Sequence, residues 1–138
     1  MLVTPYLMVH SAKQFVDFAS HVFGAQAENV MPLEGDAERV VHGQVRIGRS
    51  TLYFADAGID GGQCLPPYRP GEDPSHVQMH VTLPDPAAAY AAAVARGATP
   101  VMEVTPQGDG TEMCGWVDPF GTLWWVVSDP APAADRTP

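Results

Sequence analysis

The chain repeats itself, and this repeat constrains its fold more than any other feature of the sequence. Four pairs of identical residues are separated by the same 73 positions: Gly24 and Gly97, Ala25 and Ala98, Gly48 and Gly121, and Asp56 and Asp129. The same order of patterns recurs around each copy: a short apolar strand, a helix, a glycine stop, and three strands with a glycine turn before the last. A unit of this size cannot bury its own sheet face. The sequence therefore predicts two copies of one βαβββ unit.

The first copy carries clear local signals. Ser11, followed three residues later by Gln14, makes a capping box that predicts the start of a helix. Apolar residues then recur at helical spacing until Gly24, which ends the helix because glycine accepts the left-handed conformation needed there. Alternation over residues 39–47 predicts a half-buried strand whose polar face carries His42.

A segment rich in proline and glycine separates the two copies. It is long enough to link two halves or to lie over a site as a flap. The length of 138 residues favours a single domain. The predicted segments are a first module over residues 3–56, a linker over 57–75, a second module over 76–129, one domain over 1–130 as a whole, and a disordered tail over 131–138.

Composition argues against several classes of function. The net charge of −9 and the lack of a basic run disfavour binding to nucleic acid. The sequence shows neither a signal peptide nor an apolar run of about 18 residues, so we expect a cytoplasmic protein that does not enter membranes. Cys64 and Cys114 lack the spacing of a metal site or a disulfide framework, which favours two reduced thiols.

Residues 118–124, which read D-P-F-G-T-L-W, resemble the D-P-F-G-x-x-W element of the vicinal oxygen chelate superfamily. That group contains glyoxalase I, extradiol dioxygenases, and bleomycin- and fosfomycin-resistance proteins. Three further elements resemble its PhnB-like branch: T-P-Y-L at residues 4–7, F-G-A at 23–25 and I-G at 47–48. The resemblance covers about residues 3–129. It implies an α+β fold in which two βαβββ repeats form an eight-stranded incomplete barrel around one cavity, usually as a homodimer.

The resemblance also implies positions for a metal ion. Metal-using members hold a divalent ion through His or Glu on the first and last strands of each copy, and the ion acts as a Lewis acid. The last-strand positions lie four residues beyond the glycine turn. Counting onto this sequence gives Thr4, Gln78, Leu52 and Trp125. None of these is a His or a carboxylate, so we predict no metal site and no other cofactor.

The same count directs Trp125 into the cavity, since adjacent strand residues face opposite ways and Trp124 then packs beneath a helix. Aromatic side chains around a cavity favour planar or hydrophobic ligands. Alternatively, the rings fill a closed core, which would suit an interaction module. The predicted ligand-binding residues are Tyr6, Leu52, Phe54, Gln78, Trp116 and Trp125.

The favoured function is a glyoxalase/bleomycin-resistance-like homodimer, without the usual metal site, that binds a small apolar or aromatic compound. The alternative is a lyase or isomerase of the glyoxalase-like superfamily, with a displaced metal site or with acid–base catalysis by His42 and Glu112. A buried Glu112 would have a raised pKa and could shuttle a proton. The competing interpretation is a half-buried polar histidine and a solvated glutamate at a strand end.

Overall fold

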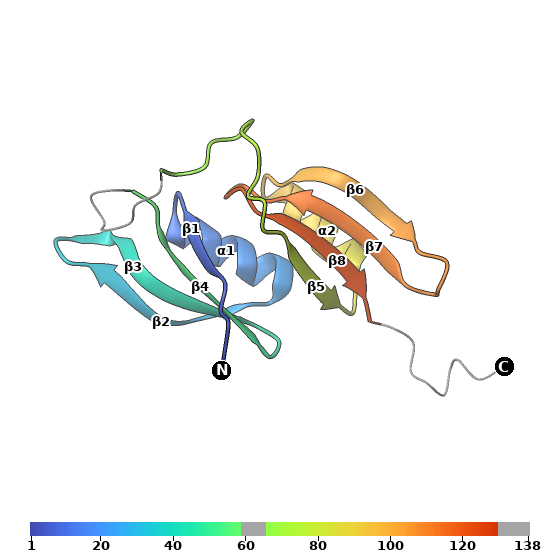
Figure 1. Cartoon of the computed structure of the whole chain (residues 1–138), viewed down its shortest axis with the longest axis horizontal. Helices are drawn as coiled ribbons and strands as arrows, with labels where there is room; N and C mark the ends of the chain where they lie inside the picture. The colour runs from blue at the N-terminus through green and yellow to red at the C-terminus, as the bar shows by residue number, and fades with distance from the viewer. Residues whose placement is uncertain (59–65, 130–138) are drawn as a thin grey trace. The chain divides into compact units, whose positions relative to one another are not determined.

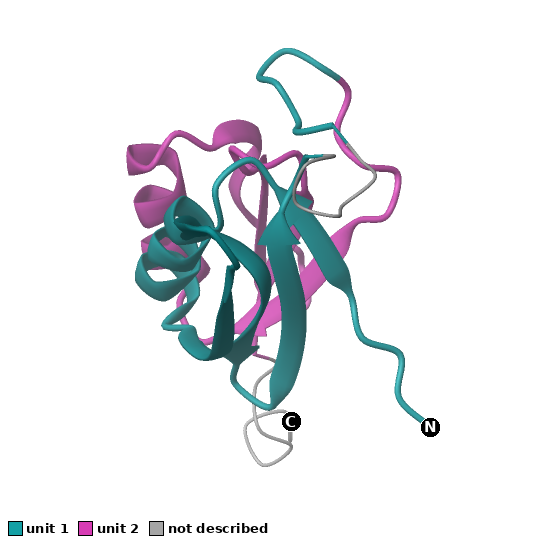
Figure 2. Cartoon of the chain, turned by 90° about the vertical axis from the view of Figure 1, so that its left-hand side faces the viewer, with its two compact units in different colours: residues 1–72 teal, residues 73–138 magenta. Residues whose placement is uncertain are grey.

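The computed structural model of the chain describes residues 1–58 and 66–129. The chain divides into two compact units, residues 1–72 and residues 73–138 (Figure 2). Each unit has its own sheet and its own helix. Cys64, part of the predicted linker and the predicted tail over residues 131–138 lie outside the described residues.

The first unit is a four-stranded sheet with one helix against one face (Figure 1). Its elements are β1 (Tyr6–Val9), α1 (Ala12–Phe23), β2 (Gln26–Leu33), β3 (Asp36–Ile47) and β4 (Ser50–Asp56). The strand order is β1-β4-β3-β2, with β1 parallel to β4 and the other pairs antiparallel. The helix begins where the Ser11 hydroxyl accepts a hydrogen bond from the backbone N–H of Gln14 at 3.2 Å. It ends at Gly24, whose φ is 65°. Both predicted helix boundaries are confirmed.

The second unit repeats this plan. Its elements are β5 (Met79–Leu83), α2 (Pro86–Ala95), β6 (Thr99–Pro106), β7 (Glu112–Val117) and β8 (Leu123–Ser128). The order β5-β8-β7-β6, with β5 parallel to β8, matches the first sheet strand for strand. Asp85 caps α2 by accepting the Ala88 amide at 3.1 Å, and Pro86 takes the first helical position, where a missing N–H costs nothing. The predicted α+β fold of two βαβββ repeats is confirmed.

Each helix covers one face of its own sheet and forms a core there. In the first unit, the rings of Phe15 on α1 and Phe54 on β4 lie 5.3 Å apart. In the second unit, Tyr90 on α2 lies 6.5 Å from Trp116 on β7. Side chains alternate between the two faces of a strand, so the residues flanking these core positions point away from the helices. We call that side the uncovered face of each sheet.

The uniform spacing of 73 residues is an average of two different spacings. Tyr6 pairs with Tyr53 in the first unit, and His80 pairs with Trp125 at the equivalent place in the second. The first strands are therefore 74 residues apart and the last strands 72. The helices agree, since Ala12 and Pro86 begin them 74 residues apart. The repeat is real, but residue-by-residue equivalence at a fixed spacing fails in the last strand.

The turn before the last strand causes this shift. Ile47 pairs with Ser50 across the first turn, whereas Val117 pairs with Leu123 across a longer second turn. Gly48 and Gly121 consequently occupy different places in their turns. A count of four residues beyond each glycine therefore reaches opposite faces of the two sheets.

Candidate functional site

Three aromatic side chains gather on the uncovered face of the first sheet. Tyr53 points away from α1 because its neighbours Leu52 and Phe54 are buried on the helix side. Tyr6 on β1 and His42 on β3 join it. The three rings are close and steeply inclined to one another, with centroid distances of 5.4 Å for Tyr6 and His42, 5.7 Å for Tyr6 and Tyr53, and 4.8 Å for His42 and Tyr53. We call Tyr6, His42 and Tyr53 the aromatic cluster.

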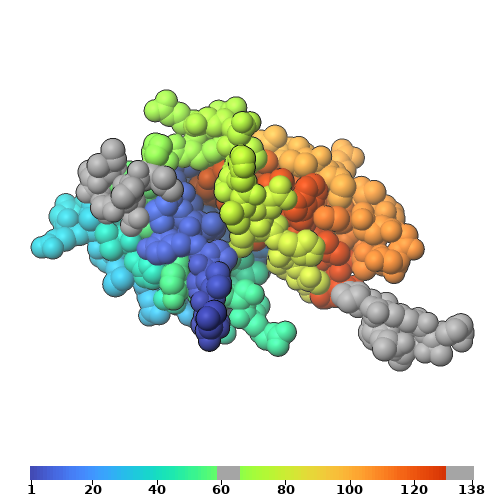
Figure 3. Space-filling view, in the orientation of Figure 1, coloured from blue at the N-terminus to red at the C-terminus, as the bar shows by residue number. Residues whose placement is uncertain are grey.

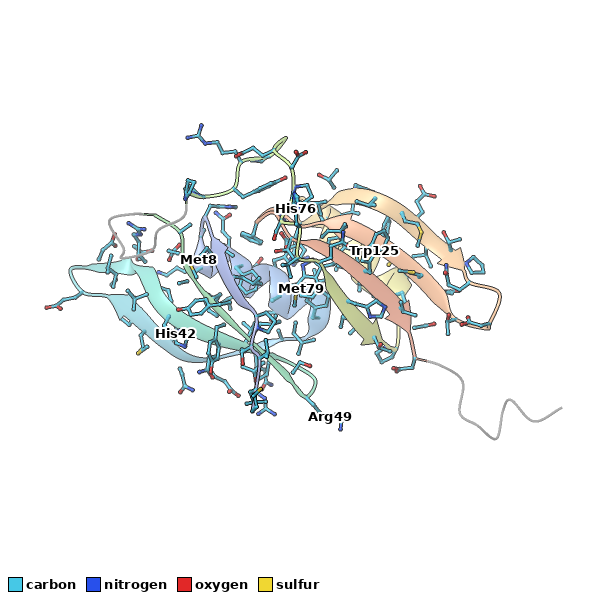
Figure 4. All side chains as sticks on the ribbon, in the orientation of Figure 1. Met8, His42, Arg49, His76, Met79 and Trp125 are labelled. Carbon is cyan, nitrogen blue, oxygen red and sulfur yellow. The ribbon has the colours of Figure 1, made fainter. Side chains whose placement is uncertain are left out.

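A hydrogen bond fixes the imidazole within this cluster. The Tyr6 hydroxyl lies 2.9 Å from Nδ1 of His42, and Figure 4 shows His42 on its strand. When the hydroxyl donates to Nδ1, the ring proton lies on Nε2. His42 then presents an N–H donor. The cluster can therefore offer ring surface and one oriented polar group to a bound molecule.

The uncovered face of the second sheet carries a different arrangement, centred on Trp125 (Figure 4). Trp125 alternates with Trp124 and Val126, which are buried on the side of α2, so its indole points away from the helix. The indole N–H donates to Oε1 of Gln78 at 2.8 Å. Gly115 on β7 pairs with Trp125, and a Cβ built on Gly115 would lie 2.7 Å from the indole atoms Cε3 and Cζ3. The ring therefore lies against bare backbone.

The residues at the positions where the superfamily binds a metal do not fit a divalent ion. Thr4 and Gln78 lie just before β1 and β5, and the matching uncovered-face positions on the last strands, β4 and β8, are Tyr53 and Trp125. These side chains are neutral or aromatic, whereas divalent metal sites in proteins are built mainly from carboxylate and imidazole donors. Across residues 1–58 and 66–129, no three His, Cys, Asp or Glu side chains converge on a point that could hold a metal ion.

Three of the six predicted ligand-binding residues lie on helix-covered faces. Leu52 is 3 % exposed, and Phe54 and Trp116 are 0 % exposed. Their side chains form the cores beneath α1 and α2, whereas the prediction placed them around the ligand cavity together with Trp125. On β4 the physical reason is the shorter first turn, which moves the uncovered position from Leu52 to its neighbour Tyr53. On β7, Trp116 pairs with the buried Trp124 and therefore lies on the helix side of the sheet.

Tyr6, Gln78 and Trp125 lie on uncovered faces, and their contact with a ligand stays a prediction. Sequence reasoning missed Tyr53 and Gly115. Strict alternation from a correctly placed β4 would have found Tyr53, whereas no sequence signal shows that Gly115 lies opposite Trp125.

The D-P-F-G-x-x-W element holds a turn together. The buried carboxylate of Asp118 accepts the backbone amides of Phe120 at 2.9 Å and Thr122 at 3.0 Å, and the indole N–H of Trp124 at 2.8 Å. Burial raises the pKa of the Asp118 carboxyl, and these donors oppose that rise because they favour the charged form. The most recognisable motif of the sequence thus holds the turn together, and most of its residues are buried.

Two other candidates of the second unit lack the surroundings of a catalytic group. Glu112 is exposed at the start of β7, and its amide donates to the Ser128 hydroxyl at 2.8 Å. Its carboxylate is solvated, which favours the strand-end interpretation over a proton shuttle. Cys114 is a free, fully buried thiol, and burial raises its pKa to about 11, with a smaller contribution from the nearby charge of Glu112. A thiol with that pKa is a poor nucleophile.

Two curated mycobacterial proteins are similar to most of the chain. The uncharacterized protein Mb0911c of Mycobacterium bovis is 30 % identical over 124 residues, which cover 88 % of this chain and 79 % of that protein. The uncharacterized protein Rv0887c of Mycobacterium tuberculosis is also 30 % identical over 124 residues, with 88 % and 71 % covered. No protein-family model matches the chain.

Solved structures with the same fold match nearly the whole chain. TioX from Micromonospora sp. ML1 is 19 % identical with a TM-score of 0.65, and the match covers 96 % of this chain and 98 % of that one. A PhnB protein from Bacillus cereus is 13 % identical with a TM-score of 0.69, with 94 % and 100 % covered. The fosfomycin resistance protein FosX from Listeria monocytogenes is 10 % identical with a TM-score of 0.64, with 99 % and 98 % covered.

In the described part of the chain, no helix is long and apolar enough to cross a membrane.

Proposed function

The chain belongs to the family of the mycobacterial proteins Mb0911c and Rv0887c, within the vicinal oxygen chelate superfamily, and from this premise we propose that it binds small aromatic compounds without the superfamily's usual metal ion. The observation that carries the proposal is the aromatic character of both uncovered faces. The first sheet presents Tyr6, His42 and Tyr53, and the second presents Trp125. Tyrosine and tryptophan bind planar molecules well because each combines a large apolar ring with one polar atom.

Core side chains already fill the space between each helix and its own sheet. A ligand is therefore restricted to the uncovered faces. Phe54 and Trp116 are enclosed in the two cores, so a ligand would have to displace a helix to reach them. The side chains of Tyr53 and Trp125 are half-buried, and that of Tyr6 is 45 % exposed. We therefore assign ligand binding to Tyr6, Tyr53, Gln78 and Trp125, and assign Leu52, Phe54 and Trp116 to the cores.

A screen of aromatic compounds by thermal shift, followed by calorimetric titration, tests this function. At least one compound should bind, and Tyr53→Ala or Trp125→Ala should weaken its binding at least about tenfold, the loss expected when one stacking ring is removed. Val101→Ala, at a half-exposed position on β6, is the control and should bind as the wild type does. Binding that is indifferent to both aromatic substitutions would refute the proposal.

Acid–base catalysis by His42 is the second candidate, and the Tyr6–His42 hydrogen bond favours it. A histidine oriented by a second group is the usual arrangement of a general base. An enzyme of this kind would exchange the α-proton of a carbonyl substrate with solvent. Incorporation of deuterium from D₂O, followed by NMR, should then be lost in His42→Ala and reduced in Tyr6→Phe. Exchange that survives His42→Ala excludes this candidate.

Elemental analysis tests the proposed lack of a metal ion. Protein purified without chelator should contain less than a stoichiometric amount of any transition metal, because the four strand positions offer neither carboxylate nor imidazole. One metal ion per chain would contradict the proposal and would favour a lyase or isomerase with a displaced site.

We further propose a cytoplasmic homodimer. Light scattering should give twice the chain mass of 14.7 kDa, and the mass of a single chain would contradict it.

A further inference from the structure

The surroundings of Trp125 hold its indole in one orientation. Gly115 lies directly opposite on β7, and the 2.7 Å between its ideal Cβ position and the indole shows that a methyl group there would collide with the ring in its present position. One side of the six-membered ring therefore rests on the backbone of β7. The hydrogen bond from the indole N–H to Gln78 restrains the other end of the ring. Backbone contact and hydrogen bond together fix the ring before any ligand arrives.

A ring fixed in this way is a stacking surface. Its inner side is occupied by Gly115, and its outer side belongs to the uncovered face, where Trp125 is only half-buried. A planar conjugated molecule can lie against this outer side at little entropic cost, because the indole needs no reordering. A saturated ring of the same size lacks the flat shape for this contact.

The hydrogen bond also orients Gln78. An indole N–H is a donor only, so it selects the oxygen of the Gln78 amide and turns the amide nitrogen away from the ring. Within the described residues, that nitrogen has no hydrogen-bond partner in the protein, and Gln78 is exposed. Two N–H donors therefore stand at the edge of the stacking surface. They can satisfy an acceptor carried by a ring that lies on Trp125.

From this geometry we propose that Trp125, Gly115 and Gln78 form a subsite for a planar conjugated ring that bears a carbonyl or similar acceptor at its edge. The inference rests on the proposed function, because it specifies the chemical class of the aromatic ligand. Trp125 supplies the stacking face and Gln78 the donor. Gly115 is a positioning residue, because it touches the indole and not the ligand.

Titration of the full-length ¹⁵N-labelled protein with three probes tests the subsite. Coumarin is planar and carries a carbonyl, naphthalene is planar without an acceptor, and cyclohexanone carries a carbonyl on a saturated ring. Coumarin should shift the indole N–H resonance of Trp125 and leave that of Trp124, which is buried against Asp118, unchanged. Naphthalene should bind about tenfold more weakly, as expected for one lost hydrogen bond. Cyclohexanone should cause no shift.

Three variants separate the roles of the residues. Gln78→Ala should remove the tenfold preference for coumarin over naphthalene. It should weaken naphthalene binding only slightly, because the contact with Gly115 still orients the indole. Gly115→Ala should move the Trp125 resonance in the free protein and weaken both planar probes at least about fivefold, because the new methyl group displaces the ring. Gln107→Ala, the same substitution at an exposed position between β6 and β7, should match the wild type.

Several results would overturn the subsite. Equal affinity for coumarin and naphthalene in the wild type would remove the acceptor requirement, and binding of cyclohexanone would remove the planar requirement. Coumarin that shifts amides at Tyr6 and Tyr53 but not the Trp125 indole would refute the subsite and leave the proposed function standing. The proposed function itself fails in the separate compound screen, if no aromatic compound there binds. A Gly115→Ala variant that does not fold leaves the test with Gln78→Ala, which changes only an exposed side chain.

Discussion

The helix-covered faces of the two units are built alike, whereas their uncovered faces differ. Beneath α1 the core includes Phe15 with Leu52 and Phe54 of β4, and beneath α2 it includes Trp116 of β7 and Trp124 of β8. The uncovered faces share no side-chain arrangement: one has a histidine bonded to a tyrosine, and the other has a tryptophan lying on a glycine. The repeated scaffold is thus kept by the packing of one face, which leaves the other face free to change.

A second difference lies at the ends of the strands. In the first unit, the Asp56 carboxylate accepts the amides of Ala12 at 2.9 Å and Val40 at 2.6 Å, which ties the start of α1 to β3 and β4. In the second unit, Ser128 takes the equivalent place beside the first strand and accepts only the Glu112 amide. The second unit instead has the buried Asp118, whose three short-range bonds fix the turn before β8. The N-terminal residues Met1, Leu2 and Val3 are exposed and project from the first unit (dark blue in Figure 3). They make none of the hydrogen bonds accepted by Asp56, Asp118 and Ser128.

The largest expected effect separates the two faces of one sheet. Trp116→Ala should lower the free energy of unfolding by about 3–5 kcal/mol, since it empties a fully buried site. Trp125→Ala should lower it by less than about 1 kcal/mol, because this half-buried ring packs outside the helix-covered core. Urea unfolding followed by circular dichroism measures both. Equal losses would mean that Trp125 is a core residue and that the assignment of faces is wrong.

The second prediction compares the hydrogen bonds accepted by Asp56, Asp118 and Ser128. Asp118→Ala leaves three buried donors without an acceptor and should cost about 2–4 kcal/mol. Asp56→Ala frees two donors and should cost about 2–3 kcal/mol, and Ser128→Ala, which frees one, about 1 kcal/mol. Hydrogen exchange by mass spectrometry should show faster exchange in residues 1–58 for Asp56→Ala and in residues 73–129 for Asp118→Ala. The opposite assignment would contradict the described bonds.

Much of this architecture could be predicted from the sequence, because its signals are local. The Ser11 cap, the Gly24 stop and the alternation around His42 depend on a few neighbouring residues, and the structure has all three. The face occupied by Leu52 could not be predicted. It depends on the length of a turn whose glycine lies at a different place in each copy, and a shift of one residue reverses both faces of a strand.

The site was predictable only in part for a related reason. Tyr6, Gln78 and Trp125 follow from the alternation of strand residues, and their aromatic or amide character suggests ligand contact. The pairing of Gly115 with Trp125 and of Tyr6 with His42 depends on strand register between segments that are distant in sequence. A single sequence carries no signal for those pairings.

The third prediction concerns pH and the longer turn of the second unit. The pKa of Asp118 is raised in the folded state, so the folded protein holds this proton more tightly than the unfolded chain does. The contribution of this raised pKa to stability is complete below the unfolded pKa, whose ordinary value is 3.8, and is lost as pH rises through the folded pKa. The stability of the wild type relative to Asp118→Asn should therefore decline as pH rises above that value. Parallel pH profiles would show that burial does not raise the pKa of Asp118.

The smallest expected effect distinguishes the two tyrosines of the aromatic cluster. Tyr6→Phe removes the hydrogen bond to His42 and should cost about 0.5–1 kcal/mol, at the low end for a partly exposed bond. Tyr53→Phe is the matched control and should cost less, because its contribution to the cluster comes from its ring. The same urea titration measures both variants. A larger loss for Tyr53→Phe would show that its hydroxyl holds the cluster together.

The most direct test of the division between faces is a crystal structure of the protein grown with the aromatic compound that gives the largest thermal shift. We predict electron density for the compound against side chains of the uncovered faces, with Trp125 or the aromatic cluster in contact and Phe54 and Trp116 still enclosed. Density for the compound between a helix and its own sheet, or a metal ion held by the strand residues, would contradict the account.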